Sequence, residues 1–195
     1  KVIGAGRGLC TVKPGDTAST TTTDATGQSV GTVSGPAADF VTSVTNIGFI
    51  VGSRGVEICG FTIGGTGGTT AANAGIYIGD GTRISVSNNW GSSQFHIHDI
   101  LMDGEGGVDG GWGMIWDGFG PGGLVENVQI HRYASGGLLV LAGNSRATIG
   151  GTFRWNEIIG CRRNGIWRQD AINGGLNKYL ANWILDDGAS ALTNG

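Results

Sequence analysis

The chain has 195 residues, of which 40 are glycine and 3 are proline, and it carries a formal net charge of −3. Glycine without a Gly-X-Y period excludes collagen, and an apolar content of 39% argues against disorder, so we expect one domain with a continuous core. A weakly acidic chain without a long basic run predicts no nucleic-acid partner. No apolar stretch approaches the ~18 residues that a membrane span needs, so none is predicted.

The first 46 residues lack a regular pattern. Residues 1–13 are expected to form a first strand pair, and residues 14–46, rich in Thr, Ser, Ala and Gly, a lateral loop or irregular first coils. Residues 47–189 are expected to form regular coils, within a single domain that spans 1–195. Because Lys1 follows no signal peptide and the chain stops soon after a repeat, we expect it to be part of a longer protein.

A two-part unit recurs about every 28 residues in the regular region. Its first part is a short apolar strand with a marker residue: Asp99 and Asn127 lie 28 positions apart, as do Asn127 and Trp155, and Asn182 follows 27 later. Its second part is an apolar strand that opens on a glycine: Gly75, Gly113, Gly137 or Gly165. Such a period indicates a solenoid, because one unit cannot bury its apolar face until its neighbours stack on it.

The repeat has neither the leucine positions of leucine-rich repeats nor a six-residue period. Short strands with Asn or Asp at a corner, loops of variable length, and the phrases at 56–63 and 128–138 resemble the right-handed parallel β-helix of the pectate-lyase-like superfamily. The likeness is greatest to phage tailspikes and other surface β-helix proteins directed at polysaccharides, and it covers about residues 47–189. It implies an all-β fold: a right-handed, single-stranded parallel β-helix (solenoid) with coils of about 28 residues.

The densest chemistry lies between residues 103 and 117. Four candidate catalytic carboxylates occur there: Asp103, Glu105, Asp109 and Asp117. Glycoside hydrolysis needs two carboxylates beside the scissile bond, and Trp112 or Trp116 would be a platform for a sugar ring. A calcium loop is the rival reading, although the spacing does not match an EF-hand, and a solvated acidic turn is the plain one. We therefore predict no cofactor, with calcium as the weak alternative.

Stacking places residues one period apart side by side. If Met102, Ile130, Ile158 and Leu185 face inward, one outward line follows on the same strands: Asp103, His131, Ile159 and Asp186. Asp103 and His131 would then be neighbours, and a carboxylate beside an imidazole can orient it for proton transfer, unless the two form only a surface ion pair. Together with His131, Arg132 is a candidate substrate-binding residue, because arginine suits the carboxylates of uronates or sialates.

The glycine-led strands predict a second outward line, which is apolar and aromatic: Tyr77, Ile115, Leu139 and Trp167. Their neighbours Ile76, Met114, Leu138 and Ile166 are predicted to face inward. An outward apolar ladder needs a cover, either a loop of the same chain or another subunit. Such faces bury against sister subunits in trimeric tailspikes, so the resemblance implies a homo-trimer.

No metal site is predicted. His96 and His98 share one face of a strand, but a zinc site needs a third ligand, and His131 is expected near a different corner. Three widely spaced cysteines, Cys10, Cys59 and Cys161, contain no Cys-x-x-Cys pair and are interpreted as buried thiols.

Three functions follow from these observations. The first is a tailspike-like β-helix at an extracellular or virion surface that binds, and in one version cleaves, a polysaccharide. The second is a secreted monomeric polysaccharide lyase or hydrolase, although the polygalacturonase motifs are absent except for the bare pair Asp186-Asp187, so neither superfamily active site is carried over. The third is a non-catalytic stalk or adhesin segment.

Overall fold

The architecture consists of β-strands. The structure, a computed structural model, describes residues 1–12, 22–23, 29–30, 44–51, 54–64, 72–79, 93–104, 111–117, 121–133, 135–141, 150–161, 164–168 and 177–185. No helix occurs among these residues, and so none of membrane-spanning length does. The expectation of an all-β chain is therefore confirmed over the described ranges.

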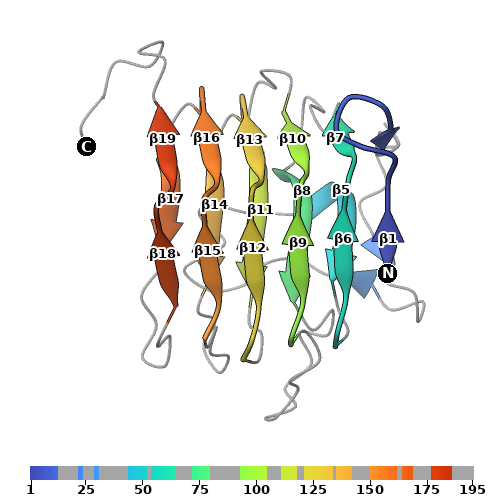
Figure 1. Ribbon diagram of the computed structural model, residues 1–195, viewed down its shortest axis with the longest axis horizontal. Helices are drawn as coiled ribbons and strands as arrows, with labels where there is room; N and C mark the ends of the chain where they lie inside the picture. The colour runs from blue at the N-terminus through green and yellow to red at the C-terminus, as the bar shows by residue number, and fades with distance from the viewer. Residues whose placement is uncertain are drawn as a thin grey trace.

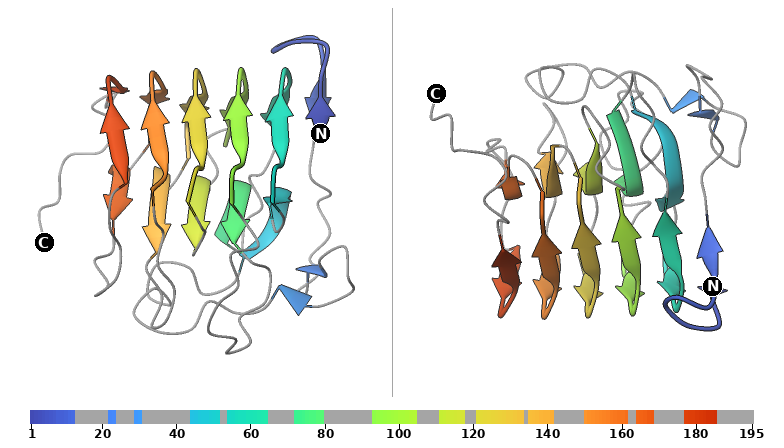
Figure 2. Two further views of the ribbon diagram at one scale, coloured as in Figure 1. Left: turned by 60° about the horizontal axis from the view of Figure 1, so that its bottom comes forward. Right: turned by 90° about the horizontal axis from the view of Figure 1, so that it is seen from above.

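The strands form three parallel sheets (Figures 1 and 2). The first sheet is ordered β1 (Val2–Ile3), β6 (Glu57–Cys59), β9 (His96–His98), β12 (Leu124–Glu126), β15 (Thr152–Arg154) and β18 (Lys178–Leu180). The second is ordered β2 (Thr11–Val12), β7 (Thr62–Gly64), β10 (Leu101–Asp103), β13 (Gln129–His131), β16 (Glu157–Ile159) and β19 (Trp183–Leu185). The third is ordered β5 (Val44–Val51), β8 (Ala72–Gly79), β11 (Trp112–Asp117), β14 (Gly136–Leu141) and β17 (Asn164–Arg168). A short antiparallel pair, β3 (Thr22–Thr23) and β4 (Ser29–Val30), completes the described elements.

The chain passes through the three sheets in turn, and each sheet stacks the successive passes in register. In the second sheet Met102 pairs with Ile130, and Ile130 with Ile158, as the 28-residue repeat predicts. All three side chains are buried in one core cluster. Figure 1 shows the passes side by side from the β1 end to the β19 end, the arrangement of a parallel β-helix.

The last described pass corrects the predicted alignment by one residue. Ile158 pairs with Ile184, and Ile159 pairs with Leu185, so Leu185 stands in the outward line and not in the inward one. Asp186, expected in that outward line, lies outside the described residues. The cause is a shorter last repeat, because Ile158 and Ile184 are 26 positions apart and not 28.

The repeat glycines Gly113, Gly137 and Gly165 are each the second residue of a third-sheet strand, where this sheet approaches the second closely. A Cβ on Gly113 would lie 2.2 Å from Cγ2 of Ile130, and a Cβ on Gly137 would lie 2.6 Å from Cγ2 of Ile158. Neither position can accept even a methyl group unless the core moves. The repeated glycine of the sequence is thus a packing requirement of the stacked passes.

The corner between the first and second sheets uses a left-handed backbone in each pass from β6–β7 to β18–β19. The residues at this corner have φ between 49° and 78°: Gly60, Asp99, Asn127, Trp155 and Ala181. Glycine, Asn and Asp tolerate this conformation, whereas a bulky residue is strained in it. Asp99 and Asn127 of the sequence repeat are therefore corner residues, whereas Trp155 and Ala181 occupy the corner without belonging to these tolerant types, and Asn182 follows the last corner by one residue.

A pair of stacked asparagines lies one residue after this corner. Asn156 is 1% exposed. Its Oδ1 accepts a hydrogen bond from Val128 N at 2.9 Å, and its Nδ2 donates to Val125 O and to Asn182 Oδ1 at 3.2 and 3.1 Å. Asn182 in turn donates to Phe153 O at 2.9 Å. The two side chains therefore bond successive passes to one another at the turn.

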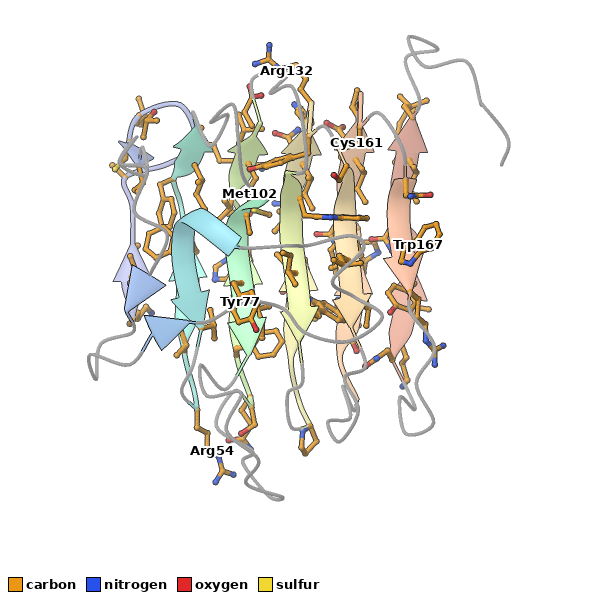
Figure 3. The ribbon with its side chains drawn as sticks, turned by 180° about the vertical axis from the view of Figure 1, so that it is seen from behind. Arg54, Tyr77, Met102, Arg132, Cys161 and Trp167 are labelled. Carbon is orange, nitrogen blue, oxygen red and sulfur yellow. The ribbon has the colours of Figure 1, made fainter. Side chains whose placement is uncertain are left out.

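The second predicted line of the third sheet is in register but is not exposed. Tyr77 pairs with Ile115, Ile115 with Leu139, and Leu139 with Trp167, as expected. Tyr77, Ile115 and Leu139 are 3%, 0% and 0% exposed within the single chain, and Trp167 is half-buried. Figure 3 shows Tyr77 and Trp167 on this sheet. The chain itself therefore covers Tyr77, Ile115 and Leu139, which is the first of the two predicted covers.

Candidate functional site

The acidic segment does not assemble into a described catalytic pair. Asp103 ends β10, and its carboxylate receives the Arg132 guanidinium: Nε donates to Oδ1 at 2.8 Å, and a second nitrogen bonds Oδ2. Glu105 and Asp109 lie outside the described residues. Asp117 ends β11, and its side chain is not among those described. The predicted two-carboxylate site therefore remains a prediction.

The sugar platform predicted at Trp112 and Trp116 is wrong. These side chains are 1% and 0% exposed. Trp116 packs in the core against Phe95, Phe153 and Tyr179, with ring centroids 6.4, 6.0 and 6.4 Å away. The physical reason is strand alternation: Trp116 is two residues from the inward-facing Met114, so both side chains point to the same side of β11.

Asp103 and His131 are neighbours in register, as predicted. The carboxylate bonded to the imidazole, however, comes from the next pass: His131 Nε2 lies 2.8 Å from Oε1 of Glu157. Arg132 is exposed and projects beyond the end of its strand (Figure 3). The two predicted substrate-binding residues therefore have different partners: His131 pairs with Glu157, and Arg132 pairs with Asp103.

An open groove of about 280 Å³ lies at the corner between the first and second sheets, and we call it the corner groove. It is lined by Asn127, Val128, Gln129, Trp155, Asn156, Glu157, Ala181 and Trp183. Its aromatic residues are Trp155, 59% exposed, and Trp183, 63% exposed. Trp183 lies on β19, the last described strand, whose residues Ile184 and Leu185 are exposed as well, so Trp155 is the indole whose exposure distinguishes this surface.

The polar side of the corner groove is held in place by hydrogen bonds. Oε1 of Glu157 accepts hydrogen bonds from Nε2 of Gln129 at 3.2 Å and pairs with His131. Asn127 donates from its Nδ2 to Asp99. The groove therefore offers a fixed carboxylate and two amide groups beside its indole rings.

Trp155 is further oriented by the charged residues of the first sheet. The Arg154 guanidinium carbon lies 4.2 Å from the centroid of the Trp155 ring, a cation–π contact. Arg154 also bonds Glu126 at 2.9 and 2.7 Å. Burial acts to raise the pKa of Glu126, but hydrogen bonds from Arg154 and His96 outweigh it, so the pKa lies below its usual value. Glu126 is therefore an anion at neutral pH, and it neutralises Arg154.

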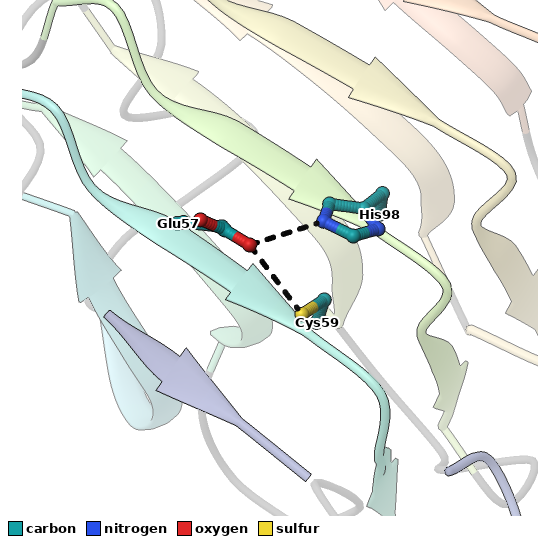
Figure 4. Close-up of side chains that lie close together, drawn as sticks. All are labelled: Glu57, Cys59 and His98. Carbon is teal, nitrogen blue, oxygen red and sulfur yellow. Dashed lines mark hydrogen bonds and ion pairs between the residues drawn. The ribbon is translucent and has the colours of Figure 1, made fainter.

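A second polar cluster lies on the outer face of the first sheet. Glu57, Cys59 and His98 bring a carboxylate, a thiol and an imidazole within 4.8 Å of one another (Figure 4). Desolvation raises the pKa of the Cys59 thiol, and the charge of Glu57 acts in the same direction. Lys1 lies 3.0 Å from Glu57 Oε1, and its hydrogen bond keeps the pKa of that carboxyl below its usual value.

Sequence reasoning assembles neither cluster. Trp155 aligns with the corner residue Asn127 in the sequence repeat, but that alignment gives no reason to expect an exposed indole. The sequence pattern pairs His98 only with His96, and it indicates a buried thiol at Cys59. Cys59 and His98 are register partners 39 positions apart. The same 39-residue offset relates Gly60 to Asp99 in the sequence, so this signal was available.

Comparison with known proteins adds no identification: no protein-family model, curated protein or solved structure matches the chain significantly.

Proposed function

We propose that the protein is a carbohydrate-binding β-helix whose binding surface is the corner groove. The observation that carries the proposal is the pair of exposed indoles, Trp155 and Trp183, beside the fixed carboxylate of Glu157. A sugar ring presents a face of C–H groups that packs on an indole, and its hydroxyls bond to carboxylates and amides. The groove combines these recognition elements in one place.

The presence of Trp155 at the corner opposes stability. A tryptophan with φ of 54° is in a conformation that costs about 1–3 kcal/mol, and its exposed ring gains little from burial. Asn127 occupies the same corner position one pass earlier without that strain. We therefore expect the strained tryptophan to have a role in binding, because an unstrained residue fills the same corner one pass earlier.

The charges of the groove favour an uncharged sugar. Glu157 is the one charged residue among the described residues that line it, and Arg154 beside it is neutralised by Glu126. A uronate would bring its carboxylate toward Glu157 and be repelled. We assign Oε2 of Glu157 to a sugar hydroxyl, and the amides of Gln129 and Asn127 to further hydroxyls.

The groove supports binding better than hydrolysis. Glycoside hydrolysis uses two carboxylates, about 5–10 Å apart, and the described lining of the groove supplies Glu157 alone. We therefore expect the polymer to be retained and its chain length to stay unchanged. Four further predictions accompany this proposal: right-handed coils, a relationship to the pectate-lyase-like superfamily, a trimer, and an extracellular or virion location.

Affinity electrophoresis in gels that contain one polymer each tests the proposal. The polymers are an uncharged β-glucan, an uncharged mannan and polygalacturonate, and the proteins are the wild type, Trp183→Ala and the control Trp167→Ala. We expect an uncharged polymer to retard the wild type and Trp167→Ala, and to retard Trp183→Ala at least about tenfold less, the loss of roughly 1.4 kcal/mol. The groove would be refuted as a glycan site if Trp183→Ala were retarded as strongly as the wild type. It would also be refuted if no polymer retarded any of the proteins. Retention by polygalacturonate alone would refute the uncharged ligand.

A further inference from the structure

We propose that Glu57, Cys59 and His98 bind a divalent transition metal ion, with Zn²⁺ the best match, on the outer face of the first sheet. The three residues offer one oxygen, one sulfur and one nitrogen. Sulfur and imidazole donors select zinc-like ions over calcium or magnesium, which take oxygen ligands. This site differs from the calcium site that the sequence offers as an alternative at residues 103–117, because that site would use other residues and only oxygen donors.

The sheet places the three donors on one surface. Glu57 and Cys59 are two residues apart on β6 and therefore point to the same side. His98 on the neighbouring β9 pairs with Cys59 in register. Figure 4 shows the three side chains converging from the two strands. Because strand pairing fixes the backbones, the donors converge without a loop having to close over the ion.

The distances fit a site that needs little adjustment. Oε1 of Glu57 lies 4.0 Å from Sγ of Cys59 and 3.6 Å from Nε2 of His98, and all three donors lie within 4.8 Å. Zinc bonds of about 2.0–2.3 Å in tetrahedral geometry separate neighbouring donors by about 3.3–3.7 Å. The donors therefore have to close by a few tenths of an ångström up to about 1 Å, within the reach of side-chain torsions. A fourth position is left for water.

The imidazole is held in the orientation that a metal ligand requires. Nδ1 of His98 bonds Oδ2 of Asp99 at 2.7 Å, and Asn127 donates to the other oxygen of Asp99. A carboxylate on the far nitrogen is the usual support of a metal-bound histidine, because it fixes the ring and its tautomer. Nε2 is thereby directed at Glu57.

Two residues next to the site, Lys1 and His96, determine what surrounds the ion. Lys1 bonds the Glu57 carboxylate, and a bound dication would take its place. His96 stacks on His98 with centroids 4.2 Å apart, while its Nε2 pairs with Glu126 at 2.9 Å. Glu126 therefore holds His96 outside the ligand set and adds a negative charge close to the ion.

A titration of chelator-treated protein with Zn²⁺, in which calorimetry measures the binding, tests the site directly. We expect one Zn²⁺ per chain, and at least about a hundredfold weaker binding in Cys59→Ser and His98→Gln. Asp99→Asn, which leaves all three ligands in place, should weaken binding about 10–100-fold. The matched controls Cys161→Ser and His131→Gln, at a thiol and an imidazole elsewhere on the solenoid, should bind as the wild type does.

Cobalt provides a readout that needs no variant. Co²⁺ bound at this site should give a thiolate-to-cobalt charge-transfer band in the near ultraviolet and the intense visible bands of a four-coordinate ion. Absence of saturable Zn²⁺ binding by the folded wild type, a cobalt spectrum without the thiolate band, or unchanged affinity in folded Cys59→Ser and His98→Gln would each overturn the proposal. None of the three metal ligands lines the corner groove, so Trp183→Ala should bind Zn²⁺ as the wild type does.

Discussion

The turn asparagine gives the sharpest stability prediction, Asn156→Ala. Its amide is buried and serves three partners: Val128 N, Val125 O and Asn182 Oδ1. Val128 and Val125 are both 0% exposed, so water cannot replace the lost partner in the folded state. The substitution therefore removes bonds between passes and leaves a buried N–H without its acceptor.

The magnitude follows from these contacts. A buried donor left unsatisfied costs about 1–3 kcal/mol, and each further lost hydrogen bond about 0.5–1.5 kcal/mol. With one orphaned N–H and two lost amide bonds, we expect the free energy of unfolding to fall by about 2–6 kcal/mol. Gln129→Ala is the matched control, because among the described residues its amide bonds the side chain of Glu157 alone, on the outer face, and it should cost no more than about 1.5 kcal/mol.

Urea unfolding followed by circular dichroism measures both values, with the free energy extrapolated linearly to water. A slope that is unchanged between variants would show that the loss lies in the native interactions and not in a changed denatured state. If Asn156→Ala costs no more than Gln129→Ala, the hydrogen bonds at this turn do not hold the passes together, and the reasoning fails.

Two further substitutions test the core. Trp116→Ala should lower the free energy of unfolding by about 3–5 kcal/mol in the same urea assay, because the ring is fully buried between Phe153 and Tyr179; a loss below about 1 kcal/mol would instead fit an exposed platform. Tyr179→Phe removes a buried hydroxyl that has no hydrogen-bond partner among the described residues, so it should be neutral or stabilise by up to about 1 kcal/mol. Burial raises the pKa of Tyr179 above its ordinary value of 10.0, so the folded chain resists ionisation and loses stability as the pH rises from 10 through the raised value. Tyr179→Phe should therefore unfold less readily than the wild type above pH 10, and an identical alkaline profile would contradict this.

Much of the stacking was predictable because the repeat fixes the register. Two successive offsets of 28 residues align Met102 with Ile130 and Ile158, and the two-residue alternation of a strand then decides which side chains face inward. The same alternation, applied to Met114, would also have placed Trp116 in the core. The prediction failed at Leu185 because the last repeat is shorter, and a one-residue slip exchanges the faces of a strand.

Neither candidate site was predictable from the 28-residue period. Trp155 becomes an exposed wall of the groove because its backbone is left-handed, a property of the corner and not of the local pattern. Cys59 meets His98 across an offset of 39 residues, so the regular period pairs Cys59 with the wrong positions. Both sites depart from the repeat, one in the residue that occupies the corner and the other in the length of the repeat, and there sequence periodicity carries the least information.

The corner groove is tested most directly by the paired effect of Trp155→Asn on stability and on glycan retention. Asparagine occupies the equivalent corner at Asn127, so the substitution should leave the free energy of unfolding unchanged or raise it by about 1 kcal/mol. Retention by an uncharged polysaccharide should fall at least about tenfold in the same protein. Undiminished retention, or a loss that appears only because the variant unfolds, would contradict the assignment of Trp155 to sugar binding.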